Sequence, residues 1–107
     1  MATSTIKGIT ESTATASSGH SLVRNRVIRK GNTLRIVIEA SGAVSANAYN
    51  SIAVLPVGYR PNTQIVKAFV PTAGATGYLR ILTDGRIDVY STIATSSVYI
   101  DETILGA

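Results

Sequence analysis

Four residues around one turn signal are the strongest candidates for binding chemistry in this sequence. Tyr78 and Arg80 precede the dipeptide Asp84-Gly85, and Asp88 and Tyr90 follow it, with one residue between the two members of each pair. A tyrosine ring offers a flat apolar face to the C–H groups of a sugar, and an arginine–aspartate pair offers planar charged groups to its hydroxyls. The pattern indicates a saccharide-binding site. Two simpler interpretations stay open: an ordinary outer strand face, or tyrosines buried between subunits.

These four side chains share a face in only one register of the predicted hairpin. A two-residue turn at Asp84-Gly85 would set Ile81 against Asp88 and mix apolar and polar faces. A three-residue loop over residues 83–85 puts Gly85 in the left-handed position that such loops require. Its cross-strand pairs are Ile81 with Ile87, Leu79 with Val89, Arg80 with Asp88, and Tyr78 with Tyr90. We predict this loop because every apolar pair then lies on one face and the four candidate residues on the other.

The chain shows no arrangement typical of an enzyme or a metal site. It contains no cysteine, one histidine (His20) and no GxSxG nucleophile motif. A single histidine without acidic neighbours cannot hold a metal, so His20 is expected to be structural or at the surface. Asp101 and Glu102 are adjacent, and strand neighbours point to opposite faces, so they cannot flank one glycosidic bond. We therefore predict no catalytic activity, no cofactor and no metal.

An earlier hairpin is predicted around Gly31-Asn32, a dipeptide that favours a type II′ turn. Its register sets Lys30 against Thr33, Val27 against Ile36, and Arg24 against Glu39. The core face would then hold Leu34, Ile36, Ile38 and Ala40 on one strand and Val27, Asn25 and Val23 on the other. Further along, Pro56 and Pro61 mark a corner, where Arg60 is expected to bond loop carbonyls.

Composition predicts one all-β domain. The 107 residues include 10 Val, 12 Ile and 13 Thr, which favour strands, and no stretch has a convincing helical period. Residues 20–107 divide into about seven short antiparallel strands, the pattern of a small Greek-key β-barrel or sandwich. Residues 1–19 are rich in Ser, Thr and Ala and are predicted to be a linker or neck, with a short strand within residues 3–10 as the alternative.

The charge pattern bears on possible partners. Charged residues make up only 15% and the mean hydropathy is +0.24, which suggests that copies of the chain cover part of its surface. No apolar run approaches the ~20 residues that span a bilayer, and the N-terminus lacks the apolar core of a signal peptide. The net charge is +4, and five basic residues cluster in the first hairpin: Arg24, Arg26, Arg29, Lys30 and Arg35. This cluster indicates either an anionic partner or a solvated strand pair whose edge is protected by charge.

Three segments in this order carry a resemblance to a known family. They are RKGNTLRIVI in the first hairpin, VLPVGYRP with its Arg60-Pro61 corner, and YLRILTDGRIDVY. Over residues 20–107 the chain resembles the C-terminal head domain of receptor-binding proteins in lactococcal siphophages. Members of this family carry His and Asp where this chain has Tyr78 and Arg80, and an arginine in a last loop that here, at residues 92–97, has none.

The resemblance implies a trimeric β-barrel at the phage tail tip that binds host cell-wall saccharides in clefts between subunits. By position, Tyr78, Arg80 and Tyr90 correspond to the family's cleft, and Asp88 completes the group. Residues 1–19 would be the remnant of a neck joining the head to other baseplate proteins. The implied location is the virion, outside the host cell and without membrane insertion.

Other functions stay open beside this one. A capsid-like jelly roll would bind nucleic acid through Arg24, Arg26, Arg29 and Lys30, although residues 1–19 contain no arginine-rich arm. A trimeric structural tail or baseplate module would bind no ligand at all. A glycan hydrolase is the third alternative, and the scattered carboxylates argue against it.

Overall fold

The computed structural model describes residues 4–6 and 9–106. Over these residues the regular structure consists of ten β-strands and no helix. Their bounds are β1 Ser4–Ile6, β2 Ile9–Ser12, β3 Thr15–Ala16, β4 Ser21–Lys30, β5 Thr33–Val44, β6 Tyr49–Val54, β7 Ile65–Phe69, β8 Gly77–Ile81, β9 Arg86–Ser91 and β10 Thr95–Leu105. The predicted all-β class is confirmed, and β4 to β10 are the seven strands expected after residue 20.

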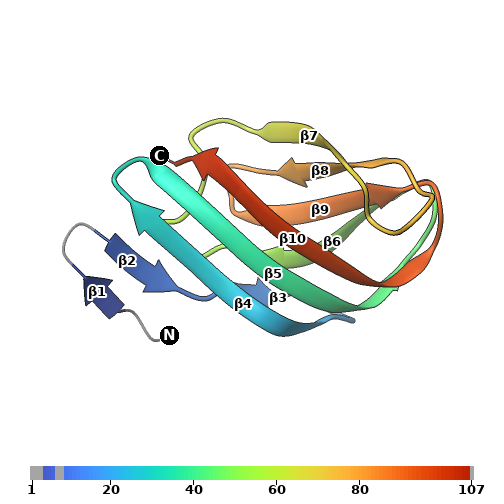
Figure 1. Ribbon diagram of the computed structural model, residues 1–107, viewed down its shortest axis with the longest axis horizontal. Helices are drawn as coiled ribbons and strands as arrows, with labels where there is room; N and C mark the ends of the chain where they lie inside the picture. The colour runs from blue at the N-terminus through green and yellow to red at the C-terminus, as the bar shows by residue number, and fades with distance from the viewer. Residues whose placement is uncertain (1–3, 7–8, 107) are drawn as a thin grey trace.

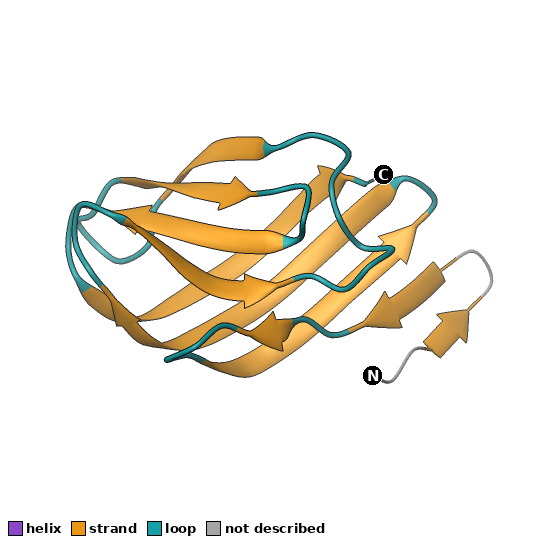
Figure 2. Ribbon diagram, turned by 180° about the vertical axis from the view of Figure 1, so that it is seen from behind, coloured by secondary structure: helices purple, strands orange, loops and turns teal. Residues whose placement is uncertain are grey.

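The strands form two antiparallel sheets that pack face to face. The front sheet has the order β1-β2-β4-β5-β10 and the back sheet has the order β3-β6-β9-β8-β7. Figure 1 shows β4, β5 and β10 running diagonally across the near side, and Figure 2 shows the other sheet from behind. Apolar side chains of both sheets are fully buried between them, including Leu34, Ile36, Ile38, Ile52, Leu79, Ile81, Ile87, Val89 and Ile100. The predicted sandwich is therefore confirmed.

The longer strands of the back sheet form a Greek key. β7, β8 and β9 follow one another in space and sequence, and β6 lies beside β9. Residues 55–64 carry the chain from β6 to β7 at the opposite edge of the sheet. At this corner Arg60 donates from Nε to the Leu55 carbonyl at 3.0 Å, as predicted. Pro61 forms an isolated bridge with Gly106, which ties the corner to the end of the chain.

The first hairpin, β4–β5, has the predicted register with one exception. Lys30 pairs with Thr33 and Arg24 with Glu39, and Gly31 has a φ of 58°, as the first position of a type II′ turn requires. The register shifts between Leu22 and Arg24. Val23, which was expected in the core, is the extra residue of this bulge and is exposed, while Leu22 packs against the core instead.

The N-terminal segment is part of the fold, contrary to the predicted linker. β2 pairs with β4 in the front sheet, and β3 pairs with β6 in the back sheet. Ser12 and Ala14 are buried where the chain passes between the sheets, because small side chains fit the narrow edge of the sandwich. The Asn25 amide supports this passage by bonding both the N–H and the carbonyl of Ala14, at 2.7 and 2.8 Å. Residues 1–3 and 7–8 of the predicted linker lie outside the described residues.

Candidate functional site

The β8–β9 hairpin has the three-residue loop that the sequence predicts. Its cross-strand pairs are Ile81 with Ile87, Leu79 with Val89, Arg80 with Asp88, and Tyr78 with Tyr90. Gly85 has a φ of 91°, in the left-handed region. Its N–H donates to the Leu82 carbonyl at 2.9 Å, which closes the loop. The four candidate residues therefore lie together on the outer face of the back sheet.

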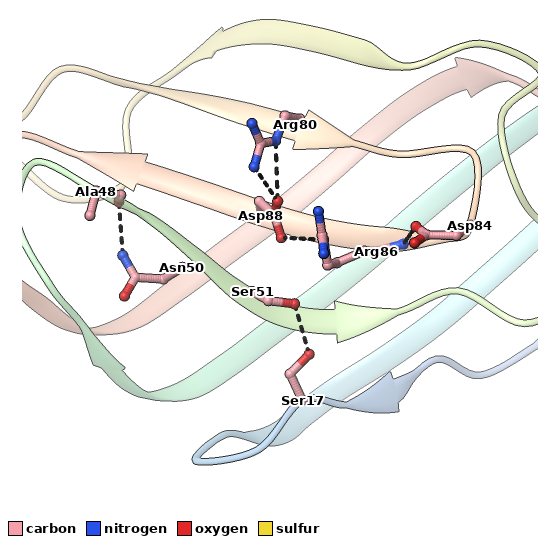
Figure 3. Close-up of polar contacts among 8 residues, drawn as sticks. All are labelled: Ser17, Ala48, Asn50, Ser51, Arg80, Asp84, Arg86 and Asp88. Atoms are coloured by element: carbon pink, nitrogen blue, oxygen red, sulfur yellow. Dashed lines mark hydrogen bonds and ion pairs between the residues drawn. The ribbon is translucent and has the colours of Figure 1, made fainter.

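An ion pair between Arg80 and Asp88 forms the centre of this face. Arg80 donates to Asp88 Oδ2 from Nε at 3.1 Å and from Nη2 at 2.7 Å (Figure 3). Asp88 is only 3% exposed although it lies on the outer face, since the longer Arg80 and Arg86 side chains are held against it. A carboxylate this buried needs charged partners to stay ionised at low cost. The pair thus fixes the position of both side chains.

Three tyrosine rings form a row beside the ion pair, because Tyr90 pairs with Tyr78 on one side and with Tyr49 on the other. Tyr90 packs edge-on against Tyr49 with ring centres 5.5 Å apart, and it is tilted against Tyr78 at 6.0 Å. The Arg80 guanidinium carbon lies 3.8 Å from the centre of the Tyr49 ring, a cation–π contact. Tyr78 remains 49% exposed. The aromatic surface is therefore pre-formed by contacts within one chain.

Three further residues of the site were not among the sequence candidates. Tyr49 and Ser51 come from β6, which pairs with β9 so that Tyr49 faces Tyr90 and Ser51 faces Asp88. A bulge after Ser51 buries Ile52 and Ala53 together and leaves the preceding residues facing outward. Only the β6–β9 pairing brings these two residues to the site, and no local pattern reveals it. Arg86 could have been found, because it precedes Asp88 by two residues and so shares its face.

A pocket of about 240 Å³ opens at this position, lined by Tyr49, Ser51, Arg80, Arg86 and Asp88. Arg86 Nε lies 3.4 Å from Asp88 Oδ1, and Ser51 Oγ is 3.1 Å from Ser17 Oγ (Figure 3). Asp88 Oδ1 is buried and accepts no hydrogen bond from the described residues. The pocket therefore presents the Ser51 hydroxyl and guanidinium donors beside the Tyr49 ring. This arrangement can bind a polyhydroxylated ligand and supplies one carboxylate, so it lacks the pair that glycosidic cleavage needs.

Three of the five basic residues in the first hairpin pair with carboxylates of the front sheet. Arg24 binds Glu39 at 3.2 Å and Arg26 binds Glu11. The guanidinium of Arg35 makes two bonds to Asp101, at 2.9 and 3.1 Å. Arg29 instead donates to the Gly58 carbonyl in the loop after β6. The positive charge of the cluster is thus partly compensated. Glu102 points the other way and binds Lys67 at 2.7 Å, which confirms that Asp101 and Glu102 lie on opposite faces.

A larger groove of about 510 Å³ lies where the two sheets meet at β7 and β10, and its lining includes Ile65, Ile104 and Leu105. Its one charged lining side chain, Lys67, is already bonded to Glu102.

His20 packs beside Gly42, as a structural residue would. Among the described residues no cluster of acidic, histidine or cysteine side chains could hold a metal ion. Over the same residues no helix is long and apolar enough to cross a membrane.

Comparison with known proteins adds no family assignment. The chain matches no protein-family model, and no curated protein sequence matches it.

Proposed function

We propose that this chain is a host-adhesion head domain of a phage tail, which binds bacterial cell-wall saccharide through the outer face of the back sheet. The binding surface, called here the tyrosine–arginine face, consists of Tyr49, Tyr78, Arg80, Arg86, Asp88 and Tyr90. The observation that carries the proposal is the ion pair of Arg80 and Asp88, which lies beside a row of three tyrosine rings and lines a pocket. The sequence resemblance supports the same conclusion.

The chemistry of the tyrosine–arginine face suits a sugar. Tyr78 and Tyr49 are partly exposed and offer apolar ring faces or edges for C–H contacts. Arg86 donates and the Ser51 hydroxyl accepts, so hydroxyl groups find both kinds of partner. The rings and the ion pair hold one another in place, which lowers the cost of ordering them when the ligand binds.

The proposal includes a homotrimer at the tail tip, outside the host cell, with the N-terminal region joined to other baseplate proteins. Large apolar side chains are exposed over the described surface, including Val57, Leu105, Val70, Val23 and Val66. A small domain that exposes such side chains and few charges is suited to self-association. Three weak sites on one trimer would raise the apparent affinity for a cell wall by ~10²-fold or more without new contacts. The nucleic-acid alternative has less support, since Arg24, Arg26 and Arg35 of the basic cluster are paired with carboxylates.

A matched pair of tyrosine variants tests the proposal. Tyr78 and Tyr99 are equally exposed, at 49% and 50%, and lie on the outer faces of different sheets. We expect the protein to bind immobilised cell-wall polysaccharide from Gram-positive bacteria, Tyr78→Ala to weaken this binding about tenfold or more, and Tyr99→Ala to leave it unchanged. Binding lost equally in both variants would place the site elsewhere. No binding to any polysaccharide of a broad panel would favour the structural module.

A further inference from the structure

We propose that Arg86 forms a subsite for an acidic sugar unit, one that carries a carboxylate or a phosphate group. This inference rests on the proposed saccharide function and names the class of sugar that the tyrosine–arginine face selects. The selecting residue is Arg86, rather than the Arg80 that the sequence pattern singles out.

Arg80 is already engaged by its neighbours. Both its Nε and its Nη2 donate to the same oxygen of Asp88, and its plane lies over the Tyr49 ring. Its side chain is only 26% exposed. A guanidinium held in this way orders the pocket wall and has few donors left for a ligand.

Arg86 is oriented by the same carboxylate and yet remains available. Its Nε lies 3.4 Å from Asp88 Oδ1, longer than a normal hydrogen bond, and its side chain is 44% exposed. The two terminal nitrogens of Arg86 form no hydrogen bond with a described residue. Asp84 accepts a hydrogen bond from the Arg86 backbone N–H, at 3.0 Å, and none from the guanidinium. These terminal donors are arranged as a fork that matches a carboxylate or a phosphate.

The charges in the pocket favour an anion. Two guanidinium groups face the single carboxylate of Asp88, so the lining carries a net positive charge. An ammonium group, as in an amino sugar, would be repelled because it would lie beside the two guanidinium groups. An anionic oxygen bonded to Arg86 completes the neutralisation, and the low exposure of Asp88 keeps the local field strong.

The size of the pocket limits how much of a ligand the subsite can hold. The pocket, about 240 Å³, lies below the range of roughly 300–1,000 Å³ for drug-sized ligands, so it suits one sugar unit.

Three small sugars distinguish the sources of negative charge: a methyl glucuronide, a glucose phosphate and the neutral methyl glucoside. Each is titrated into the protein while NMR follows the Nε–H signal of Arg86 and the amides of β9. We expect about millimolar binding of at least one acidic sugar, about tenfold tighter than the glucoside. The glucuronide and phosphate arms show whether carboxylate or phosphate is preferred. The preference should shrink as salt is raised, because the subsite is partly exposed.

A matched pair of arginine variants controls for net charge. Arg86→Gln should abolish the preference for the acidic sugar, whereas Arg24→Gln, on the front sheet and 65% exposed, should keep it. Equal binding of acidic and neutral sugars, a preference that survives Arg86→Gln, or no shift at the pocket at about 50 mM sugar would each overturn the inference. Polysaccharide binding that depends on Tyr78 and not on Arg86 would overturn this inference alone and leave the proposed function standing.

Discussion

Asp88 is the residue on which the site depends. It sits on the outer face of a sheet, where a carboxylate is ordinarily solvated, and is nevertheless almost completely buried. Arg80 satisfies one of its oxygens with two bonds, and the other oxygen is left to a distant contact with Arg86. The carboxylate therefore anchors both arginines of this face.

Arg80→Ala is therefore expected to cost stability as well as binding. Removing the guanidinium leaves a buried carboxylate with only the long contact to Arg86, and we expect a loss of about 2 kcal/mol in the free energy of unfolding. Arg24→Ala breaks an exposed pair with Glu39 and should cost less than ~1 kcal/mol. Urea unfolding of both variants measures the difference. Equal small losses would show that Asp88 does not depend on Arg80.

At the scale of elements, the β8–β9 hairpin and the β6–β7 corner support each other. The Gly85 carbonyl accepts the Leu55 N–H at 2.8 Å, and Arg60 bonds the Leu55 carbonyl. A side chain at Gly85 would have its Cβ 2.6 Å from that carbonyl oxygen and 2.7 Å from Arg60 Nε. The loop that orders the site is thus fixed both by its own backbone and by the neighbouring corner.

Gly85→Val tests this coupling, with Gly58→Val as its control. Both glycines have a similar φ, 91° and 93°, so backbone strain of ~1–3 kcal/mol applies to both variants. A Cβ at Gly58 meets no atom within 4 Å, whereas one at Gly85 meets the corner. We expect Gly85→Val to be the more destabilising by at least ~1 kcal/mol in chemical denaturation. Equal losses would mean that strain alone explains the preference for glycine.

The ion pairs of the front sheet predict how stability depends on pH. Hydrogen bonds from Arg26 and Arg35 lower the pKa of Glu11 and Asp101 below their ordinary values of 4.5 and 3.8. The unfolded chain therefore binds more protons over this range, and stability rises with pH there. The contribution of these two ion pairs to the free energy of unfolding is complete above the ordinary pKa values of the carboxyl groups. It is lost as the pH falls through their lower pKa values in the folded state.

We accordingly expect the urea midpoint to fall between about pH 5 and about pH 2, and the fall to be smaller in Glu11→Gln combined with Asp101→Asn. An unchanged profile in the double variant would show that these pairs contribute nothing to folding. The result also reports on β2, since Glu11 lies in the segment that the sequence favours as a linker.

At the scale of the whole molecule, ten strands over the described residues make a sandwich whose sheets both include N-terminal residues. The outer face of the front sheet is covered by ion pairs, and that of the back sheet carries the tyrosine–arginine face. The two faces of the molecule therefore differ in what they offer a partner. Exposed valines and Leu105 lie outside both groups and are available for contacts between subunits.

A homotrimer is the expected state of the purified protein. Light scattering at micromolar concentration should give about three times the 11.2 kDa chain mass. Burial of exposed apolar side chains between copies supplies the driving force, so the trimer should persist at raised salt. A monomer at all concentrations would contradict this expectation and would remove the gain in avidity from the proposed function.

The sequence alone determined the local structure of both hairpins. Alternating apolar residues and a glycine at each turn admit one register, because a slip by one residue would exchange the two faces of a strand. For this reason the pairs Arg80 with Asp88 and Tyr78 with Tyr90 were predictable, as was the Arg60 corner. The same local reasoning failed at Val23, since a bulge leaves no mark on the alternation until the partner strands are known.

Only the tertiary structure decided which distant segments complete the site and the core. Tyr49 and Ser51 reach Asp88 because β6 returns beside β9, a pairing between residues far apart in sequence that no local pattern encodes. Likewise, residues 9–16 contain one large apolar side chain, Ile9, and they join the sheets because main-chain hydrogen bonds and the Asn25 amide satisfy their backbone. The burial of Asp88 is a third example, because it arises from the arginines and rings that meet over it rather than from its place in the hairpin.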